Sequence, residues 1–228
     1  MLYFDYYYLI LVVPALIISL IAQINVKNTY AKMARIANKK HLTGAQAAIS
    51  VLQSYGINDV KVELGRGKLS DHYDPRSNVI RLSPEVYSGT SIAAVGIACH
   101  EAGHAAQHAQ NYVPIKVRNT ILPVANIGST FGFYLAIFGY FLGYGLLIDI
   151  GIILFASVAV FQLVTLPIEF NASRRAIAII EERNLLYEDE VPQAKKVLMA
   201  AAMTYVAALL TSIASLLRLI LRTRNRRN

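Results

Sequence analysis

Apolar residues in this chain form long, nearly uncharged stretches instead of alternating with polar ones. Residues 3–24 contain one charged side chain, Asp5, and residues 121–168 also contain one, Asp149. A helix of about 20 residues crosses a hydrocarbon core of roughly 30 Å. The first stretch therefore predicts one membrane-spanning helix, and the second is long enough for a hairpin of two.

The first stretch is expected to remain in the protein as an anchor. It has neither the basic start nor the small-x-small cleavage pattern of a signal peptide. A cluster of three tyrosines near its beginning is typical of a membrane interface: Tyr6, Tyr7 and Tyr8.

The predicted hairpin is rich in glycine and is expected to turn near residues 144–149. Apolar surface does not drive helices together in lipid, so they pack closely where small residues let their backbones approach. The hairpin offers five such residues: Gly128, Gly132, Gly139, Gly143 and Gly145.

A fourth apolar stretch, residues 198–217, contains more Ala, Ser and Thr, which is typical of a helix that faces other helices. If the N-terminus lies outside the cell, residues 25–120 and 169–197 face the cytoplasm and hold 17 of the 22 Lys and Arg residues, as the positive-inside rule requires. The same orientation leaves four arginines of the basic tail outside: Arg222, Arg224, Arg226 and Arg227. Either the last helix spans the membrane and its tail violates the rule, or it does not span and lies at the interface or re-enters. Three to four membrane spans are therefore expected in total.

Composition supports a membrane protein. Hydrophobic residues make up 55% of the 228 residues and charged residues 16%, and the mean hydropathy is +0.43. Water-soluble domains carry about 25% charged residues. The net charge of +8 comes without an RNP, zinc-finger or helix-turn-helix pattern, so membrane topology explains it and no nucleic-acid partner is expected. The single cysteine, Cys99, excludes an intrachain disulfide and is interpreted as a packing residue.

Residues 25–120 are the one polar segment of domain size, and they begin with a helix signal. Thr43 and Gln46 form a capping-box pattern. The helix is expected over residues 45–55, with Gly56 as its stop.

Three short strands are expected next and are interpreted as a small antiparallel sheet: residues 59–64, 69–73 and 78–82. Ser83–Pro84 then predicts a helix start, because proline is favoured at the first helical position. Thr90 would cap a longer helix that runs to about Gln110.

The longer helix contains the sequence His100-Glu101-Ala102-Gly103-His104. Histidines four residues apart lie on one helical face, about 6 Å apart along the axis, where both can bind one metal ion. A zinc ion held by two histidines, one further ligand and water lowers the pKa of that water toward neutrality. Glu101 can take the water's proton and deliver it to a leaving amine. The motif therefore predicts peptide-bond hydrolysis with one zinc ion per chain.

The third zinc ligand is expected from another part of the chain. The metzincin pattern requires histidine where this chain has Gln110, and His108 lies about 12 Å along the helix from His100. Glu169 is the leading candidate, because a carboxylate at the edge of an apolar span is costly and points to a function. One polar turn offers three rivals: Asp71, His72 and Asp74.

Four segments resemble the YugP-type neutral zinc metallopeptidases, integral membrane proteins of bacteria. They are SDHYDP at 70–75, GTSIAAVGIACHEAGHAAQH at 89–108, LPIEFNASRRA at 166–176 and AAAMTYVA at 200–207. The resemblance runs nearly from end to end and implies a multi-pass, zinc-dependent membrane protease with a gluzincin-type, zincin-like domain.

The chain is more distantly similar to the HtpX-type and CaaX-type membrane proteases, in which a glutamate well downstream of the histidine motif is the third zinc ligand. Carried over by motif, that ligand is Glu169. Those relatives have an aspartate four residues later, whereas this chain has Ser173. The resemblance thus implies that a hydroxyl orients a metal-bound histidine here, with a weaker effect on ligand basicity than a carboxylate has.

The substrate of such enzymes is expected to add as a strand to an edge of the sheet. The candidate edge is the last strand, formed by Asn78, Val79, Ile80, Arg81 and Leu82. The oxyanion that develops during hydrolysis needs a hydrogen-bond donor or a positive charge. Four residues are candidates for that role: His72, His108, Arg174 and Arg175.

The leading hypothesis is a mostly α integral membrane protein with a small α+β zincin-like domain that cleaves peptides or proteins, membrane proteins included. Five segments are expected: an anchor (1–24), a catalytic domain (25–120), a hairpin (121–168), a membrane-surface segment with the third ligand (169–197), and an apolar helix with a basic tail (198–228). The domain is expected to face the cytoplasm.

Two alternatives belong to other classes. One is a catalytically silent membrane scaffold with a structural zinc ion, which would be four-coordinate and closed. The other is a metal transporter, which ranks last because the spans contain few ionisable residues. The sequence favours no particular oligomeric state.

Overall fold

The computed structural model describes residues 5–224, and the chain divides into two compact units. The helical unit contains residues 5–23, 116–167 and 203–224. The mixed unit, of helices and strands, contains residues 24–115 and 168–202. Two parts of the predicted elements lie outside the described range: residues 3 and 4 of the first predicted span, and Arg226 and Arg227 of the basic tail.

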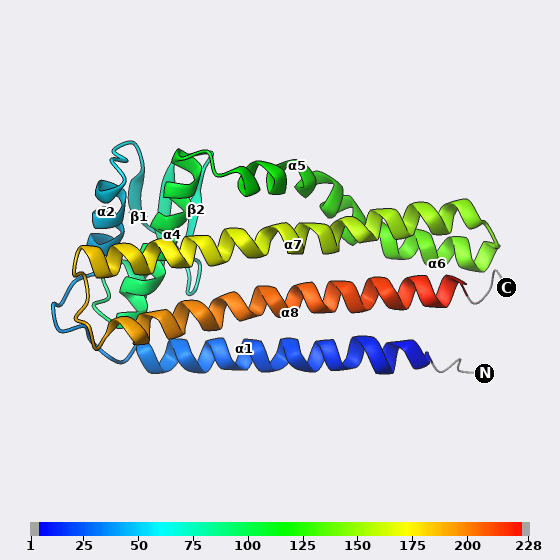
Figure 1. Ribbon diagram of the computed structural model, residues 1–228, viewed down its shortest axis with the longest axis horizontal. Coiled ribbons are helices and arrows are strands. Elements are labelled where there is room, and N and C mark those ends of the chain that lie inside the picture. The colour runs from blue at the N-terminus through cyan, green and yellow to red at the C-terminus, as the bar shows by residue number, and fades with distance from the viewer. Residues whose placement is uncertain (1–4, 225–228) are drawn as a thin grey trace. The chain divides into compact units, whose positions relative to one another are not determined.

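Long helices dominate the described chain (Figure 1). They are η1 (Tyr8–Val12), α1 (Val13–Met33), α5 (Val113–Ile127), η2 (Gly128–Gly132), α6 (Phe133–Leu142), α7 (Gly145–Glu182) and α8 (Val191–Arg224), where η marks a π-helical turn. Four stretches of the described chain are long and apolar enough to cross a membrane: Tyr8–Met33, Val113–Leu142, Gly145–Glu182 and Val191–Thr223. Together with a three-stranded sheet, they confirm the predicted fold class.

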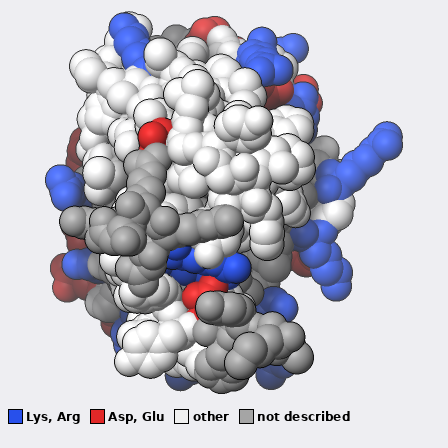
Figure 2. All heavy atoms as spheres, turned by 90° about the vertical axis from the view of Figure 1, so that its right-hand side faces the viewer, with Lys and Arg blue, Asp and Glu red and all other residues white. Residues whose placement is uncertain are grey.

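The helical unit exposes large apolar side chains, as a surface in contact with lipid does. Leu146 and Ile153 are 73% and 70% exposed. The end of the molecule at the right of Figure 1 shows mainly uncharged side chains to the viewer (Figure 2).

The hairpin extends further in both directions than expected. Its first arm begins at Val113, and its turn includes Gly143, whose φ of +74° is a conformation that glycine adopts readily. α7 then runs unbroken through Pro167 to Glu182. The membrane-surface segment expected over residues 169–197 therefore does not begin a new helix, because its first part, up to Glu182, continues α7. A proline removes one backbone donor, and such a loss is tolerated in a membrane helix.

The hairpin glycines allow the close backbone approach that the sequence predicted. A Cβ atom on Gly132 would lie 2.7 Å from the Phe155 nitrogen, and one on Gly139 would lie 2.7 Å from the Leu147 side chain. A Cβ atom on Gly128 would collide with the Leu154 carbonyl oxygen. The two arms can therefore pack this closely only with glycine at these positions.

The sheet of the mixed unit has the strand order β1-β3-β2. β3 pairs antiparallel with β2 and parallel with β1, so the expectation of a purely antiparallel sheet is wrong. The strands are β1 (Lys61–Leu64), β2 (His72–Asp74) and β3 (Val79–Leu82).

The predicted substrate edge, Asn78–Leu82, is also wrong. β3 is the central strand, and both of its sides are occupied by β1 and β2. Its side chains explain this position, because Val79, Ile80 and Leu82 are buried, whereas β1 is mostly exposed. The free edges of the sheet belong to β1 and β2.

The helix signals of the mixed unit are confirmed with one shift. In α2 (Gly44–Ser54) the capping box is present: the Thr43 hydroxyl accepts from the Gln46 N–H, and the Gln46 side chain accepts from the Thr43 N–H. Pro84 begins α3 (Pro84–Tyr87). α4 (Ile92–Ala109) is capped by Ser91, whose hydroxyl accepts from the Ala94 N–H, and not by Thr90.

The core of the mixed unit is built around α4, whose inward residues are mostly small and fully buried. Small residues let neighbouring helices come close. A Cβ atom on Gly103 would lie 2.7 Å from the Ala172 carbonyl oxygen, so α7 passes directly against α4 at the histidine motif. This contact places the turn of α7 that carries Glu169 beside the two histidines.

Candidate metal centre

Three potential ligand atoms converge where α4 meets α7. The Nε2 atoms of His100 and His104 are 3.1 Å apart, and they lie 3.4 and 3.6 Å from Oε2 of Glu169. Zinc binds nitrogen and oxygen at about 2.1 Å, so two corners of a tetrahedral site are about 3.4 Å apart. The three atoms therefore match one face of a zinc tetrahedron, which leaves one position of a four-coordinate site for water.

The burial of these side chains also suits a metal ion. Glu169 is 5% exposed, and the His100 and His104 side chains are 16% and 17% exposed. A buried carboxylate needs a positive partner, because desolvation of an unpaired charge is costly. A cation between the three ligand atoms would supply that partner.

The electrostatics of His104 point the same way. Its burial opposes the charged form, but the hydrogen bond to Glu169 and the charge of Glu101 outweigh this effect, so the pKa of His104 is raised. The surroundings of His104 therefore favour positive charge.

Glu101 lies on α4 between the two histidines in sequence and faces β2. Its carboxylate accepts a hydrogen bond of 3.0 Å from the backbone N–H of Tyr73. Tyr73 is paired with Ile80 of β3, and its N–H points away from β3 to reach Glu101. The outer edge of β2 therefore borders the candidate general base.

Each of the two histidines has a polar partner on its other ring nitrogen. The Ser173 hydroxyl lies 3.1 Å from Nδ1 of His100, which is the contact that the resemblance implied. Oε1 of Gln107 lies 3.1 Å from Nδ1 of His104. Sequence reasoning missed Gln107 and its neighbour Asn171, although residues three apart on a helix are close enough to interact.

The rival ligands make other contacts instead, and two of them, His72 and Asp74, lie on β2 and not in a turn. The exposed His72 ring contacts the Ser70 carbonyl oxygen, and the Asp71 carboxylate accepts from the Ser83 N–H and hydroxyl. Asp74 accepts hydrogen bonds from the Ser77 hydroxyl and the Arg76 N–H and pairs with Arg81, and these contacts lower its pKa from 3.8 to about 2. Among the described residues, the group able to hold a metal ion is His100, His104 and Glu169.

The candidates for oxyanion stabilisation separate in space. The exposed His108 ring packs edge-on against Tyr73 of β2, with centroids 5.9 Å apart. Arg175 donates to Asn171 and Gln110. Of these two, His108 is the one that lies against β2. Cys99 is fully buried, and burial raises the pKa of its thiol, which fits a packing residue.

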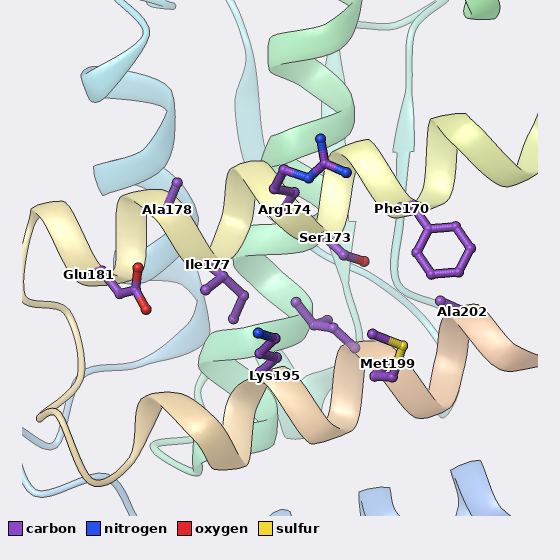
Figure 3. Close-up of a pocket in the computed structure, with 10 residues that line it drawn as sticks. Phe170, Ser173, Arg174, Ile177, Ala178, Glu181, Lys195, Met199 and Ala202 are labelled. Carbon is purple, nitrogen blue, oxygen red and sulfur yellow. The ribbon is translucent and has the colours of Figure 1, made fainter.

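A cavity of about 330 Å³ lies between α7 and α8 within the mixed unit (Figure 3). Ile177, Leu198 and Met199 are among its apolar lining residues, and Ser173 borders it. Arg174 also lines the cavity, with its guanidinium pointing away from α8 in the figure. The Ser173 hydroxyl that contacts His100 is thus next to open space.

Comparison with known proteins agrees with this geometry. Residues 8–224 match the model of a family described as "Putative neutral zinc metallopeptidase". The chain is also 44% identical over 214 residues to the "Putative membrane protease YugP" of Bacillus subtilis (strain 168), covering 94% of this chain and 95% of that protein. No solved structure matches the chain significantly. The chain therefore belongs to the neutral zinc metallopeptidase family of that description.

Proposed function

We propose that this protein is a membrane-bound zinc endopeptidase. The observation that carries the proposal is the triangle of ligand atoms from His100, His104 and Glu169, with Glu101 on the same helix at the free edge of a sheet. The family match and the similarity to a membrane protease support it. Each chain would hold one zinc ion through these three residues.

Zinc bound here would polarise the scissile carbonyl and lower the pKa of a water molecule. Glu101 takes the proton of the attacking water and passes it to the leaving amine. The Tyr73 N–H holds the Glu101 carboxylate in place for both transfers. His108, which lies against β2, is our candidate donor to the oxyanion.

The peptide substrate is proposed to add as a strand to β2 instead of β3. β2 is an edge strand, and its outer side borders Glu101. A peptide paired with that edge would run alongside the general base, with its side chains alternating in direction. Peptide or protein substrates, including membrane proteins, are compatible with this arrangement.

The protein is proposed to cross the membrane four times. In the helical unit, Asp5 pairs with Arg218 at 2.8 Å and with Arg222 at 3.1 Å, so the start of η1 and the end of α8 lie together. The Thr211 hydroxyl also contacts the Ala15 carbonyl oxygen of α1 at 3.5 Å. These contacts favour a last helix that spans alongside the first over one that re-enters. Asp5, Arg218 and Arg222 are thus paired with one another, as charged side chains in a membrane protein usually are.

A Glu101→Gln variant tests the catalytic proposal. It is expected to retain zinc and to cleave unstructured peptides about 10²- to 10⁴-fold more slowly, because the amide cannot accept the water's proton. Glu63→Gln, an exposed change on β1, is the matched control. Full cleavage by the Glu101→Gln variant would contradict the role of Glu101 as general base. Zinc binding without cleavage by the wild type would favour the alternative, a catalytically silent membrane scaffold with a structural zinc ion. Zinc per chain and cleavage rate are measured on the same samples.

A further inference from the structure

Gln107 is a fully buried amide on α4, among neighbours that are mostly small and apolar. Its Nε2 donates to the Ile168 carbonyl oxygen at 2.8 Å and to Oδ1 of Asn171 at 2.9 Å. Its Oε1 faces Nδ1 of His104 at 3.1 Å. All of its polar atoms are therefore committed, which is what a buried amide requires.

The Ile168 carbonyl fixes the direction of this amide. A backbone carbonyl oxygen can only accept hydrogen bonds, so the NH₂ group of Gln107 must face it. The amide oxygen must then face His104, and because it can only accept, Nδ1 of His104 must carry the proton. In the neutral imidazole, Nε2 of His104 then carries the lone pair, directed at the position where the three ligand atoms converge.

Asn171 prevents the opposite orientation. Its Oδ1 also accepts from Nε of Arg175 at 2.7 Å, so this atom is an acceptor for two donors. Rotating the Gln107 amide by half a turn would place its oxygen against two acceptor oxygens, those of Ile168 and Asn171. The positions of the oxygen and nitrogen atoms in a glutamine amide are usually ambiguous, but here the neighbouring hydrogen-bond partners allow only one assignment.

The partner of His100 imposes no such direction. A serine hydroxyl can either donate or accept, and Ser173 lies beside the cavity between α7 and α8 (Figure 3). The two histidine ligands are therefore held differently, and His104 is the one whose tautomer is dictated by the fold.

We propose that Gln107 is a positioning residue that locks His104 into the Nδ1–H tautomer, which is the one able to bind zinc through Nε2. α7 then has two roles at the site: it supplies Glu169, and through the neighbouring Ile168 carbonyl it sets the proton position on His104. The role in zinc binding rests on the proposed function, whereas the tautomer itself does not.

The affinity test compares two variants on one helix. Gln107→Met keeps a similar shape but removes every hydrogen bond of the amide, and the full-length protein is expected to bind zinc about 10- to 100-fold more weakly in competition with a chelator. Gln110→Met removes only an exposed partner of Arg175 and is expected to bind zinc like the wild type. Unchanged zinc affinity in Gln107→Met would overturn the proposal.

A second measurement needs neither a folded Gln107 variant nor zinc. Nitrogen NMR of ¹⁵N-histidine in the metal-free wild type, at alkaline pH where imidazole is neutral, is expected to show the His104 proton on Nδ1, with the signal assigned by its loss in His104→Ala. A proton on Nε2 would refute the inference. A wild type that fails to bind zinc would instead contradict the proposed function and leave the tautomer result standing.

Discussion

At the scale of single residues, the site depends on one buried carboxylate. Glu169 approaches the Nε2 atoms of both histidines and is 5% exposed. Two histidines alone bind zinc more weakly than three ligands do, and open coordination positions then fill with water. The third ligand is therefore expected to decide whether the chain retains its metal during purification.

A Glu169→Gln variant is expected to lower the zinc content from about one ion per chain to near zero, because a neutral amide is a poor zinc ligand. Elemental analysis of detergent-purified protein measures the change. Glu182→Gln, an exposed change at the end of the same helix, serves as the control and should retain zinc. Normal zinc content in Glu169→Gln would mean that another residue completes the site.

Asp74 predicts a pH dependence of stability. Its pKa is lowered from 3.8 to about 2 by the Ser77 hydroxyl, the Arg76 N–H and Arg81. A lowered pKa contributes stability above the unfolded value, and that contribution is lost as the pH falls toward about 2. The melting temperature of Asp74→Asn should therefore be below that of the wild type at pH 5, and the difference should shrink as the pH falls through this window. A constant difference would contradict the assignment.

The residue scale also shows what the sequence can predict. The spacing on one helix singles out His100 and His104, the edge of an apolar span and the resemblance single out Glu169, and the resemblance alone singles out Ser173. Gln107 does not, because its role depends on the Ile168 carbonyl oxygen, 61 residues away in sequence. The role of a buried amide depends on hydrogen-bond partners that only the folded structure brings next to it.

At the scale of elements, two helices meet at a glycine. Gly103 lets α7 pass against α4, whereas Gly96, on the same helix, has more room: a Cβ atom there would meet Ala194 at 3.6 Å. The two positions make a matched pair, because a change from glycine to alanine stabilises the helical conformation of α4 by about 1 kcal/mol at either position. A difference between the two variants therefore reflects the contacts around each position.

Gly103→Ala is expected to destabilise the protein by about 1–3 kcal/mol and to weaken zinc binding, because the new methyl group pushes the Ala172 carbonyl and hence Glu169 away from the histidines. Gly96→Ala is expected to leave zinc binding unchanged and stability equal or higher. Thermal unfolding in detergent and chelator competition measure both. Equal behaviour of the two variants would show that close packing at Gly103 does not position Glu169.

The sheet shows why pairing is harder to predict than strands. The alternation of residues identified all three strands near their observed positions, but it contains no information about which strand lies between the others. The clearest signal was the apolar character of β3, since Val79, Ile80 and Leu82 are buried, whereas neither β1 nor β2 contains a buried residue. A strand covered on both faces and both edges is expected to be the most apolar.

At the scale of the whole molecule, four candidate spans make a prediction about sides. If the N-terminus lies outside, each span moves the chain to the other side of the membrane. Lys68, between the first and second spans, and Glu188, between the third and fourth, then face the cytoplasm. Tyr144, between the second and third spans, faces outward.

Single cysteines introduced at these positions into a Cys99→Ala background test this topology. A membrane-impermeant maleimide added to intact cells should label Tyr144→Cys and spare Lys68→Cys and Glu188→Cys. Labelling of Lys68→Cys alone would mean that α7 does not cross the membrane. Labelling of Lys68→Cys and Glu188→Cys, with Tyr144→Cys spared, would mean that the orientation is the reverse of the one predicted.

The ion pair between Asp5 and Arg218 joins residues 213 positions apart in the chain. During synthesis the first helix is made long before Arg218 and Arg222. The Asp5 carboxylate therefore has neither of these partners until the last helix has been synthesised. The ligand set is delayed in the same way, because Glu169 follows the histidines by more than sixty residues. A nascent chain therefore lacks the contact between its first and last helices until the end of synthesis, and the proposed hydrolytic centre can form only after residue 169 has been added.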